Sequence, residues 1–252
     1  MATGRGRGIA VAISVLLIVV GGLGLLRAVG GERTTTEVLP AAETVVVTTG
    51  SGDVDLVATD RDDVSVRLEA RQTWPRQVTL ETDESGGTLT LRTECSGVAL
   101  PLSRCSGNVV VELPGDVAAQ VETGSGEVRL GGITGDVAVQ TGSGDVVVSG
   151  TSGRVTLRTG SGDIEVEGLG SSGGSLRTGS GSIEVVAEDE PDELAAETGS
   201  GDVLIVLPSD TPYAVDVETG SGEENIQVAT DPDSDHHIVA RTGSGDIELR
   251  EG

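Results

Sequence analysis

The chain has 252 residues and a formal net charge of −25, with 41 Asp and Glu against 16 cations that are all Arg. Such an acidic surface repels phosphate groups, so nucleic-acid binding is excluded as a function. Acidity without any Lys also favours an origin in high salt, where counterions screen self-repulsion; an acidic surface combined with codon bias is the alternative.

The N-terminal residues have the pattern of a membrane anchor. The 19 residues from Gly8 to Leu26 are uncharged and rich in Ile, Val and Leu. As a helix they would span about 28 Å, enough to cross a bilayer. We therefore predict a short cytoplasmic tail at residues 1–7, a transmembrane helix at 8–30 and a linker at 31–43. A signal peptide cleaved near Ala28-Val29-Gly30 is the alternative.

Residues 44–122 are expected to form an irregular N-terminal part of the repeat domain. The tetrapeptide Thr-Gly-Ser-Gly occurs once, at Thr49, and then not again for 70 residues. Apolar and polar residues still alternate through this stretch, which indicates strands with one buried face. The strands are predicted to form either widened coils or an antiparallel cap.

The two cysteines of the chain, Cys95 and Cys105, lie within this irregular part and flank a loop that contains Pro101. An even number of cysteines behind an export-type N-terminus indicates a disulfide formed outside the cell; two free thiols are the alternative. The Arg residues on the two sides of the predicted anchor balance, so the cysteines decide the orientation. The repeat domain is therefore expected to be extracellular on a single-pass protein of the cell membrane.

Residues 123–252 contain regular repeats. Within them the tetrapeptide recurs with spacings of 18, 18, 19, 20, 21 and 23 residues. A short, nearly fixed period is typical of architectures in which each unit buries its apolar side against its neighbours. The eight copies begin at Thr49, Thr123, Thr141, Thr159, Thr178, Thr198, Thr219 and Thr242.

Each repeat contains two short runs of alternating apolar and polar residues, separated by Gly/Ser turns. The aliphatic positions form two columns that should face inward. Because such short strands cannot stand alone, we predict an all-β fold, a parallel β-solenoid of about 18–23-residue coils stacked about 4.8 Å apart. The first column is Val54/Leu56, Val128/Leu130, Val146/Val148, Ile164/Val166, Ile183/Val185, Val203/Ile205 and Ile247/Leu249; the second is Val121, Val139, Leu157, Leu176, Ala196, Val217 and Ala240.

A carboxylate follows most copies of the tetrapeptide. Stacked coil on coil, Asp145, Asp163, Asp202 and Asp246 are candidate ligands for Ca²⁺, which takes carboxylate and carbonyl oxygens. The calcium-binding nonapeptide pattern is not met, because the Asp follows the second Gly directly. The alternative is a carboxylate that accepts hydrogen bonds from the backbone N–H groups of its turn.

Other motifs carry less chemistry. Asp231, Asp233 and Asp235 resemble the start of a helix-loop-helix Ca²⁺ loop, but its Gly and Glu positions are not matched. His236 and His237 could bind a transition metal, although neighbours on a strand point to opposite faces, and a solvated loop is the alternative. Glycine-rich matches at 168–173 and 170–174 do not open a helix and are expected by chance among 39 glycines.

The repeated Thr-Gly-Ser-Gly-Asp-[Val/Ile]-x-[Val/Ile/Leu] units and the Leu-Pro-x-Asp turns at 113–116 and 207–210 resemble the "putative adhesin" family. This is a family of prokaryotic β-solenoids of unknown function, and the resemblance covers about residues 44–252. It implies a surface-exposed, non-enzymatic domain, associated in some members with cell-envelope stress modules. It implies no catalytic residues, cofactor or ligand.

The sequence thus predicts a membrane-anchored, surface-exposed solenoid, not an enzyme, that contacts an unknown surface, envelope component or protein partner. A polymer-forming scaffold is the alternative, because no cap is evident at the C-terminus. A polysaccharide-acting β-helix enzyme is disfavoured by the scarcity of aromatic residues, one Trp and one Tyr. Recognition is expected in the segments that do not repeat: the Cys95–Cys105 loop and the acidic insertions at 188–193 and 231–235.

Overall fold

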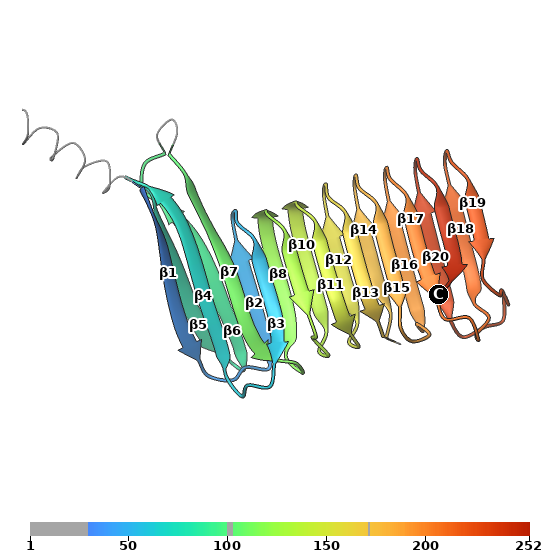
Figure 1. The fold of residues 1–252 in the computed structure, drawn as a ribbon, viewed down its shortest axis with the longest axis horizontal. Helices are drawn as coiled ribbons and strands as arrows, with labels where there is room; N and C mark the ends of the chain where they lie inside the picture. The colour runs from blue at the N-terminus through green and yellow to red at the C-terminus, as the bar shows by residue number, and fades with distance from the viewer. Residues whose placement is uncertain (1–29, 100–102, 171) are drawn as a thin grey trace, which may run out of the picture.

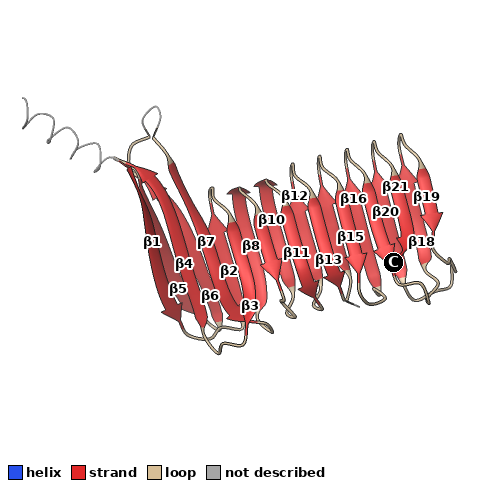
Figure 2. Ribbon diagram, in the orientation of Figure 1, coloured by secondary structure: helices blue, strands red, loops and turns tan. Residues whose placement is uncertain are grey.

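The structure is a computed structural model that describes residues 30–99, 103–170 and 172–252, whose regular secondary structure consists of strands (Figures 1 and 2). The strands form an 11-stranded first sheet and a 10-stranded second sheet. The chain crosses from one sheet to the other at each corner, so that together the sheets make a rod. The predicted tail and anchor lie outside the described residues, except for Gly30. Within these ranges we find no helix capable of spanning a membrane.

The first sheet contains, in spatial order, β1 (Gly30–Leu39), β4 (Val64–Thr73), β7 (Cys105–Pro114), β3 (Val54–Thr59), β9 (Val128–Gly131), β11 (Val146–Thr151), β13 (Ile164–Leu169), β15 (Ile183–Ala187), β17 (Val203–Leu207), β21 (Ile247–Glu251) and β19 (Glu224–Gln227). The second contains β18 (Ala214–Thr219), β20 (His237–Thr242), β16 (Glu193–Thr198), β14 (Gly174–Thr178), β12 (Val155–Thr159), β10 (Val137–Ser143), β8 (Ala118–Ser125), β2 (Thr44–Thr49), β6 (Thr88–Ser96) and β5 (Gln77–Ser85).

The middle of the rod is the predicted parallel β-solenoid. Each coil gives one strand to each sheet, as β12 and β13 do, and each strand pairs in parallel with its equivalents in the flanking coils. The register places Thr159 opposite Thr141 on one side and opposite Thr178 on the other. The tetrapeptide therefore repeats in space as it does in sequence.

The core consists of the two predicted aliphatic columns. Leu157, Leu176, Ile164 and Val166, for example, are at most 1% exposed. Burying one such side chain contributes roughly 1.5–3 kcal/mol, so the stacked columns are the main source of stability. Among the predicted core residues Val217 is only partly buried, because β18 is an edge strand with no coil beyond it.

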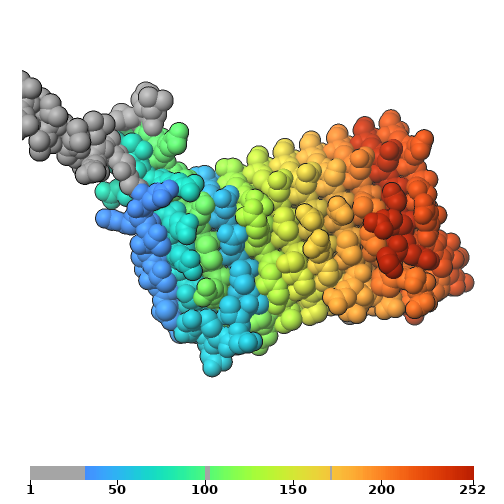
Figure 3. All heavy atoms as spheres, viewed as in Figure 1, coloured from blue at the N-terminus to red at the C-terminus, as the bar shows by residue number. Residues whose placement is uncertain are grey.

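At the C-terminal end the order of coils in space differs from their order in sequence. β20 lies between β16 and β18, and β21 lies between β17 and β19. In Figure 3 the darkest red residues accordingly have orange, earlier residues on both sides. The expectation that the C-terminal strand leaves an exposed edge is therefore wrong: the last coil is inserted, and the edge coil is β18–β19.

The physical reason lies in the side chains that face inward. Glu224 of β19 stands opposite Ile247 of β21, at a position that is aliphatic in the other regular coils. An inward carboxylate is costly between two coils but not at the end, where it reaches water. Its Oε1 also accepts a hydrogen bond from the N–H of Thr219 on β18, at 3.0 Å.

The N-terminal end is an antiparallel cap, one of the two predicted forms. β1 pairs antiparallel with β4, β4 with β7, and β5 with β6. Most of the range 31–43, predicted as a linker, is instead strand, because β1 extends the first sheet along the whole of β4. As at the other end, one coil is out of order: β2–β3 lies between β6–β7 and β8–β9.

Candidate functional site: the stacked corner and the disulfide loop

The tetrapeptides form a continuous corner along the rod. The Thr residue of each copy points inward, and all but Thr219 of the end coil are buried. Thr178 Oγ1 donates to the carbonyl oxygen of Gly162 in the preceding coil at 2.9 Å, and Thr198 repeats this contact with Gly181 at 2.8 Å. These hydroxyls therefore connect neighbouring coils, which is a structural role.

The carboxylates that follow the tetrapeptides also connect neighbouring coils. Asp145 Oδ1 accepts from the N–H of Asp163 at 2.9 Å, and Asp202 Oδ1 accepts from the N–H of Asp246 at 2.9 Å. Asp163 and Asp246 make the same contact with Ser182 and Glu223. The alternative to Ca²⁺ binding, a carboxylate that accepts hydrogen bonds from backbone N–H groups of a turn, is therefore what the structure has. Each N–H group belongs to the turn of the adjacent coil, not to the carboxylate's own turn.

The four Ca²⁺ candidates are thus placed as two adjacent pairs. Ser182 stands between Asp163 and Asp202 in the column. In the described part of the chain no three His, Cys, Asp or Glu residues are grouped as metal ligands. The geometry therefore supplies a hydrogen-bonded column with one acidic side chain per coil, interrupted by Ser182.

The two histidines point apart, as neighbours on a strand do. His237 is exposed at the start of β20, whereas His236 is partly buried. The His236 ring lies edge-to-face against Tyr213, with centroids 6.1 Å apart, and its Nδ1 lies 3.2 Å from the carbonyl oxygen of Pro191. His236 thus connects the two acidic insertions, since Pro191 belongs to one and Asp231, Asp233 and Asp235 to the other.

Tyr213 is fully buried beneath this junction. Its hydroxyl donates to the carbonyl oxygen of Pro208 at 3.1 Å. Burial, and secondarily the negative charges of Glu190 and Glu251, raises the pKa of Tyr213 to about 12. The phenol is therefore neutral at physiological pH and packs as part of the core.

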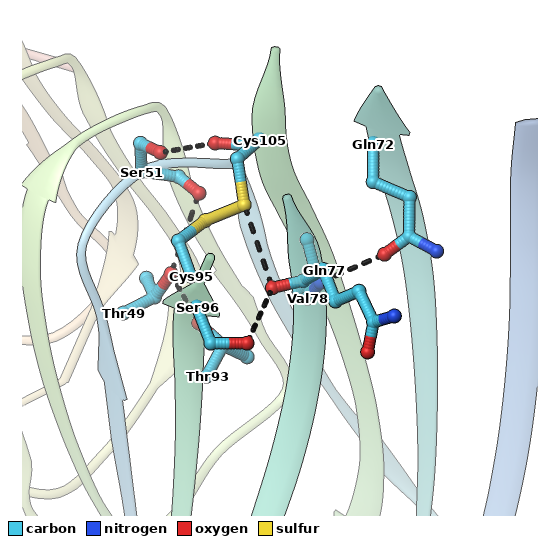
Figure 4. The surroundings of a disulfide bond; sticks show 9 residues. All are labelled: Thr49, Ser51, Gln72, Gln77, Val78, Thr93, Cys95, Ser96 and Cys105. Carbon is cyan, nitrogen blue, oxygen red and sulfur yellow. Dashed lines mark hydrogen bonds between the residues drawn. A yellow bond between two sulfur atoms is a disulfide. The ribbon is translucent and has the colours of Figure 1, made fainter. Parts of the chain in front are cut away.

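Cys95 and Cys105 form a disulfide, with Cα atoms 6.0 Å apart (Figure 4). Cys95 is the penultimate residue of β6 in the second sheet and Cys105 is the first residue of β7 in the first sheet, so the bond joins the two sheets at the cap. The bond closes an insertion at the corner. Thr93, which pairs with Thr49, marks the start of this insertion. Asn108 marks its end, where its side chain accepts a hydrogen bond from the N–H of Asp53 as the usual carboxylate would. The bond restores a tight corner where the tetrapeptide is missing.

A cavity of about 250 Å³ adjoins the disulfide, and sequence reasoning missed it. Its walls come from the turn that follows β2, from β5, β6 and β7, and from Arg76, which precedes β5. These segments are far apart in sequence, and no motif connects Arg76 with the cysteines. Recognition is predicted for the Cys95–Cys105 loop, which this cavity adjoins, but Arg76 lies outside that loop.

The outer faces of the sheets differ in charge. In coil β12–β13, Arg158 points outward from the second sheet, and Glu165 and Glu167 point outward from the first. A shallow groove of about 210 Å³ crosses the second sheet over β2, β8, β10 and β12, where the small side chains of Ala118 and Ala138 leave space beside Arg154. This face is the more neutral of the two.

These features define a disulfide-stapled β-solenoid whose repeated residues hold the coils together. The Toastrack DUF4097 family model matches residues 99–250, and the chain belongs to this family. No match is found among curated proteins.

Two solved structures of similar proteins can be compared with this chain's fold. A putative adhesin from Bacteroides fragilis NCTC 9343 is 13% identical, with a TM-score of 0.58, and the alignment covers 87% of this chain and 98% of that one. A putative cell adhesion protein from Clostridium sporogenes ATCC 15579 is 12% identical over 88% of this chain and 100% of that one, with a TM-score of 0.38. Only the first is close enough to support the fold, and at this identity it supports nothing further.

Proposed function

We propose that this protein is a membrane-anchored, non-catalytic interaction module whose solenoid stands outside the cell. The observation that carries the proposal is the use of the repeated polar residues. Five of the Thr hydroxyls, those of Thr159, Thr178, Thr198, Thr219 and Thr242, donate to glycine carbonyl oxygens of adjacent coils. The Asp carboxylates of the corner accept from N–H groups of adjacent coils. Residues used in this way build a rod, so binding falls to the outer faces and to the segments that do not repeat.

The position of the cap fits an anchor at that end. Gly30, where the described chain begins, is the first residue of β1 and lies at the opposite end of the rod from β19 (Figure 1). With residues 8–30 in a membrane, the rod would project its regular coils away from the bilayer. The disulfide suits an oxidising compartment outside the cytoplasm.

The polymer-forming alternative is disfavoured by the edge coil. An inward-facing charge is one of the means by which natural sheets prevent edge-to-edge pairing, and Glu224 supplies it. Asp216 and Glu218 of β18 and Glu223 lie in the same coil. A second copy placed against this end would bring like charges together.

Protease shaving of intact cells tests the proposal. The solenoid should be lost from intact cells, while a cytoplasmic protein in the same sample survives until the cells are permeabilised. The remaining membrane fraction should retain an N-terminal epitope tag. Survival of the solenoid in intact cells, or its release into the medium without protease, would contradict surface exposure or anchoring respectively.

A further inference from the structure

The cavity beside the disulfide has one cationic side chain in its wall, Arg76. Its other walls include Ser51, Thr93, Val78 and the disulfide itself. Figure 4 shows these residues together around the Cys95–Cys105 bond. At about 250 Å³ the cavity is far larger than the roughly 10–15 Å³ that a single water molecule needs. It can therefore hold a small organic group.

Arg76 has no acidic partner in the described ranges. Its Nε is buried and has no hydrogen-bond acceptor there, and its guanidinium takes part in no ion pair. A guanidinium keeps its charge at any physiological pH, so the buried Nε–H cannot be removed by loss of a proton. The chain has 41 acidic residues, yet none of those in the described ranges pairs with Arg76. A bound ligand could supply the missing acceptor.

The remaining polar groups of the cavity can assist an anion. Ser51 Oγ donates to the carbonyl oxygen of Cys105 at 3.4 Å, longer than a usual O–H···O bond, so this hydroxyl can turn towards a better acceptor. Thr93 is different, because its hydroxyl donates to Thr49 Oγ1 at 2.7 Å and is already committed. Arg76 and Ser51 thus both line the cavity and are the donors in its wall that lack a strong acceptor.

We propose that this cavity binds a carboxylate-bearing ligand, held by the guanidinium of Arg76 and the hydroxyl of Ser51. The planar fork of a guanidinium matches the two oxygens of a carboxylate. Phosphate would fit the same fork, but the net charge of −25 repels a dianion more strongly than a monoanion. The assignment is independent of the cellular location of the protein.

Isothermal titration calorimetry of the full-length chain in a non-ionic detergent tests the site. Sodium acetate is titrated at constant ionic strength against sodium chloride, and inorganic phosphate is titrated in parallel. Acetate should bind saturably with one site per chain, and Arg76→Gln should weaken it by about 10-fold or more. Arg92→Gln removes the same charge from an exposed position on β6 and should bind acetate as the unmodified chain does.

Two further variants separate binding from folding. Arg76→Lys keeps the charge but loses the fork and should bind acetate with intermediate affinity, and Ser51→Ala should weaken acetate while retaining the circular dichroism of the folded chain. No saturable acetate binding by the unmodified chain would overturn the proposal. Equal losses in Arg76→Gln and Arg92→Gln would do the same, and tighter binding of phosphate would overturn the choice of carboxylate.

Discussion

The second glycine of each tetrapeptide is required for two separate reasons, as Gly162 illustrates. Its φ is 147°, in a region that side chains avoid. A Cβ at this position would also overlap the carbonyl oxygen of Gly144 in the adjacent coil. Close stacking of coils, more than the turn itself, therefore explains why the motif recurs so faithfully.

Gly162→Ala should consequently destabilise the chain by roughly 3 kcal/mol or more, the sum of backbone strain and overpacking. Gly150→Ala is the matched control, because Gly150 has a φ of 61° but no heavy atom within 4 Å of the place that a Cβ would take. It should cost about 1–2 kcal/mol, from backbone strain alone. Urea unfolding followed by circular dichroism measures both, and equal costs would show that coil contact is unimportant at this corner.

Tyr213 gives the chain a single titration in the alkaline range, since it is the only Tyr and the sequence contains no Lys. Its folded pKa is about 12, above the value of about 10 for an unfolded chain. The unfolded state therefore loses the proton first, and the stability is full below pH 10 and falls as pH rises towards 12.

The expected slope of the unfolding free energy over this range is at most about 1.4 kcal/mol per pH unit. Tyr213→Phe should lose about 1 kcal/mol at neutral pH, because the hydrogen bond to Pro208 is removed, but it should show no slope above pH 10. Denaturant unfolding at several pH values decides the matter. A slope that persists in Tyr213→Phe would assign it to some other group.

At the scale of elements, the columns of alternating aliphatic residues predicted the strands and their inward faces. The same pattern could not predict the order of coils, because each tetrapeptide fits equally well against any other. One residue, Glu224, distinguishes the end coil from the inserted one. Likewise nothing in the composition of residues 31–43 separated a linker from β1, whose pairing with β4 is antiparallel and has no repeat signature.

The candidate site was predictable to the extent that it depends on neighbours in sequence. The carboxylate column followed from the repeat, and the cysteine pair followed from its spacing and the export-type N-terminus. The cavity did not, because Arg76, Ser51 and Thr93 come together only through the pairing of β2 and β5 with β6. Position in the stack, which the sequence leaves open, decides what lies beside the disulfide.

The disulfide should stabilise the cap locally. Cys95→Ser combined with Cys105→Ser should lower the free energy of unfolding by about 2–3 kcal/mol, as expected for a closed loop with a sequence separation of 10. Hydrogen exchange should accelerate in β5–β7, while β12–β15 in the middle of the rod keep their protection. Reductant added to the unmodified chain should reproduce the change, and a lack of response would argue against the bond's stabilising role.

At the scale of the whole molecule, the inward acid of the edge coil should keep the rod from associating end to end. Glu224→Ile makes this coil resemble the interior coil beside it and releases the N–H of Thr219. We expect concentration-dependent association in sedimentation velocity. Glu165→Ile places the same side chain on the outer face in the middle of the rod and should stay monomeric. Association of both variants would indicate nonspecific stickiness.

The net charge of the molecule predicts that its stability depends on salt concentration. The repulsion between one pair of residues allows this effect to be measured at a single site. Glu165 and Glu184 are direct partners on β13 and β15, with side chains on the outer face, about one strand spacing of 4.8 Å apart. At 0.01 M salt the screening length is about 30 Å and the pair repels, whereas at 1 M it is about 3 Å and the repulsion is screened. Glu184→Gln should thus raise the free energy of unfolding in dilute NaCl by about 0.5 kcal/mol. In 1 M NaCl the same substitution should change the free energy of unfolding little. The unmodified chain should gain thermal stability, measured by circular dichroism, from the lower to the higher concentration. A midpoint independent of NaCl would remove the argument for adaptation to high salt, because charge repulsion would then not limit the stability of the rod.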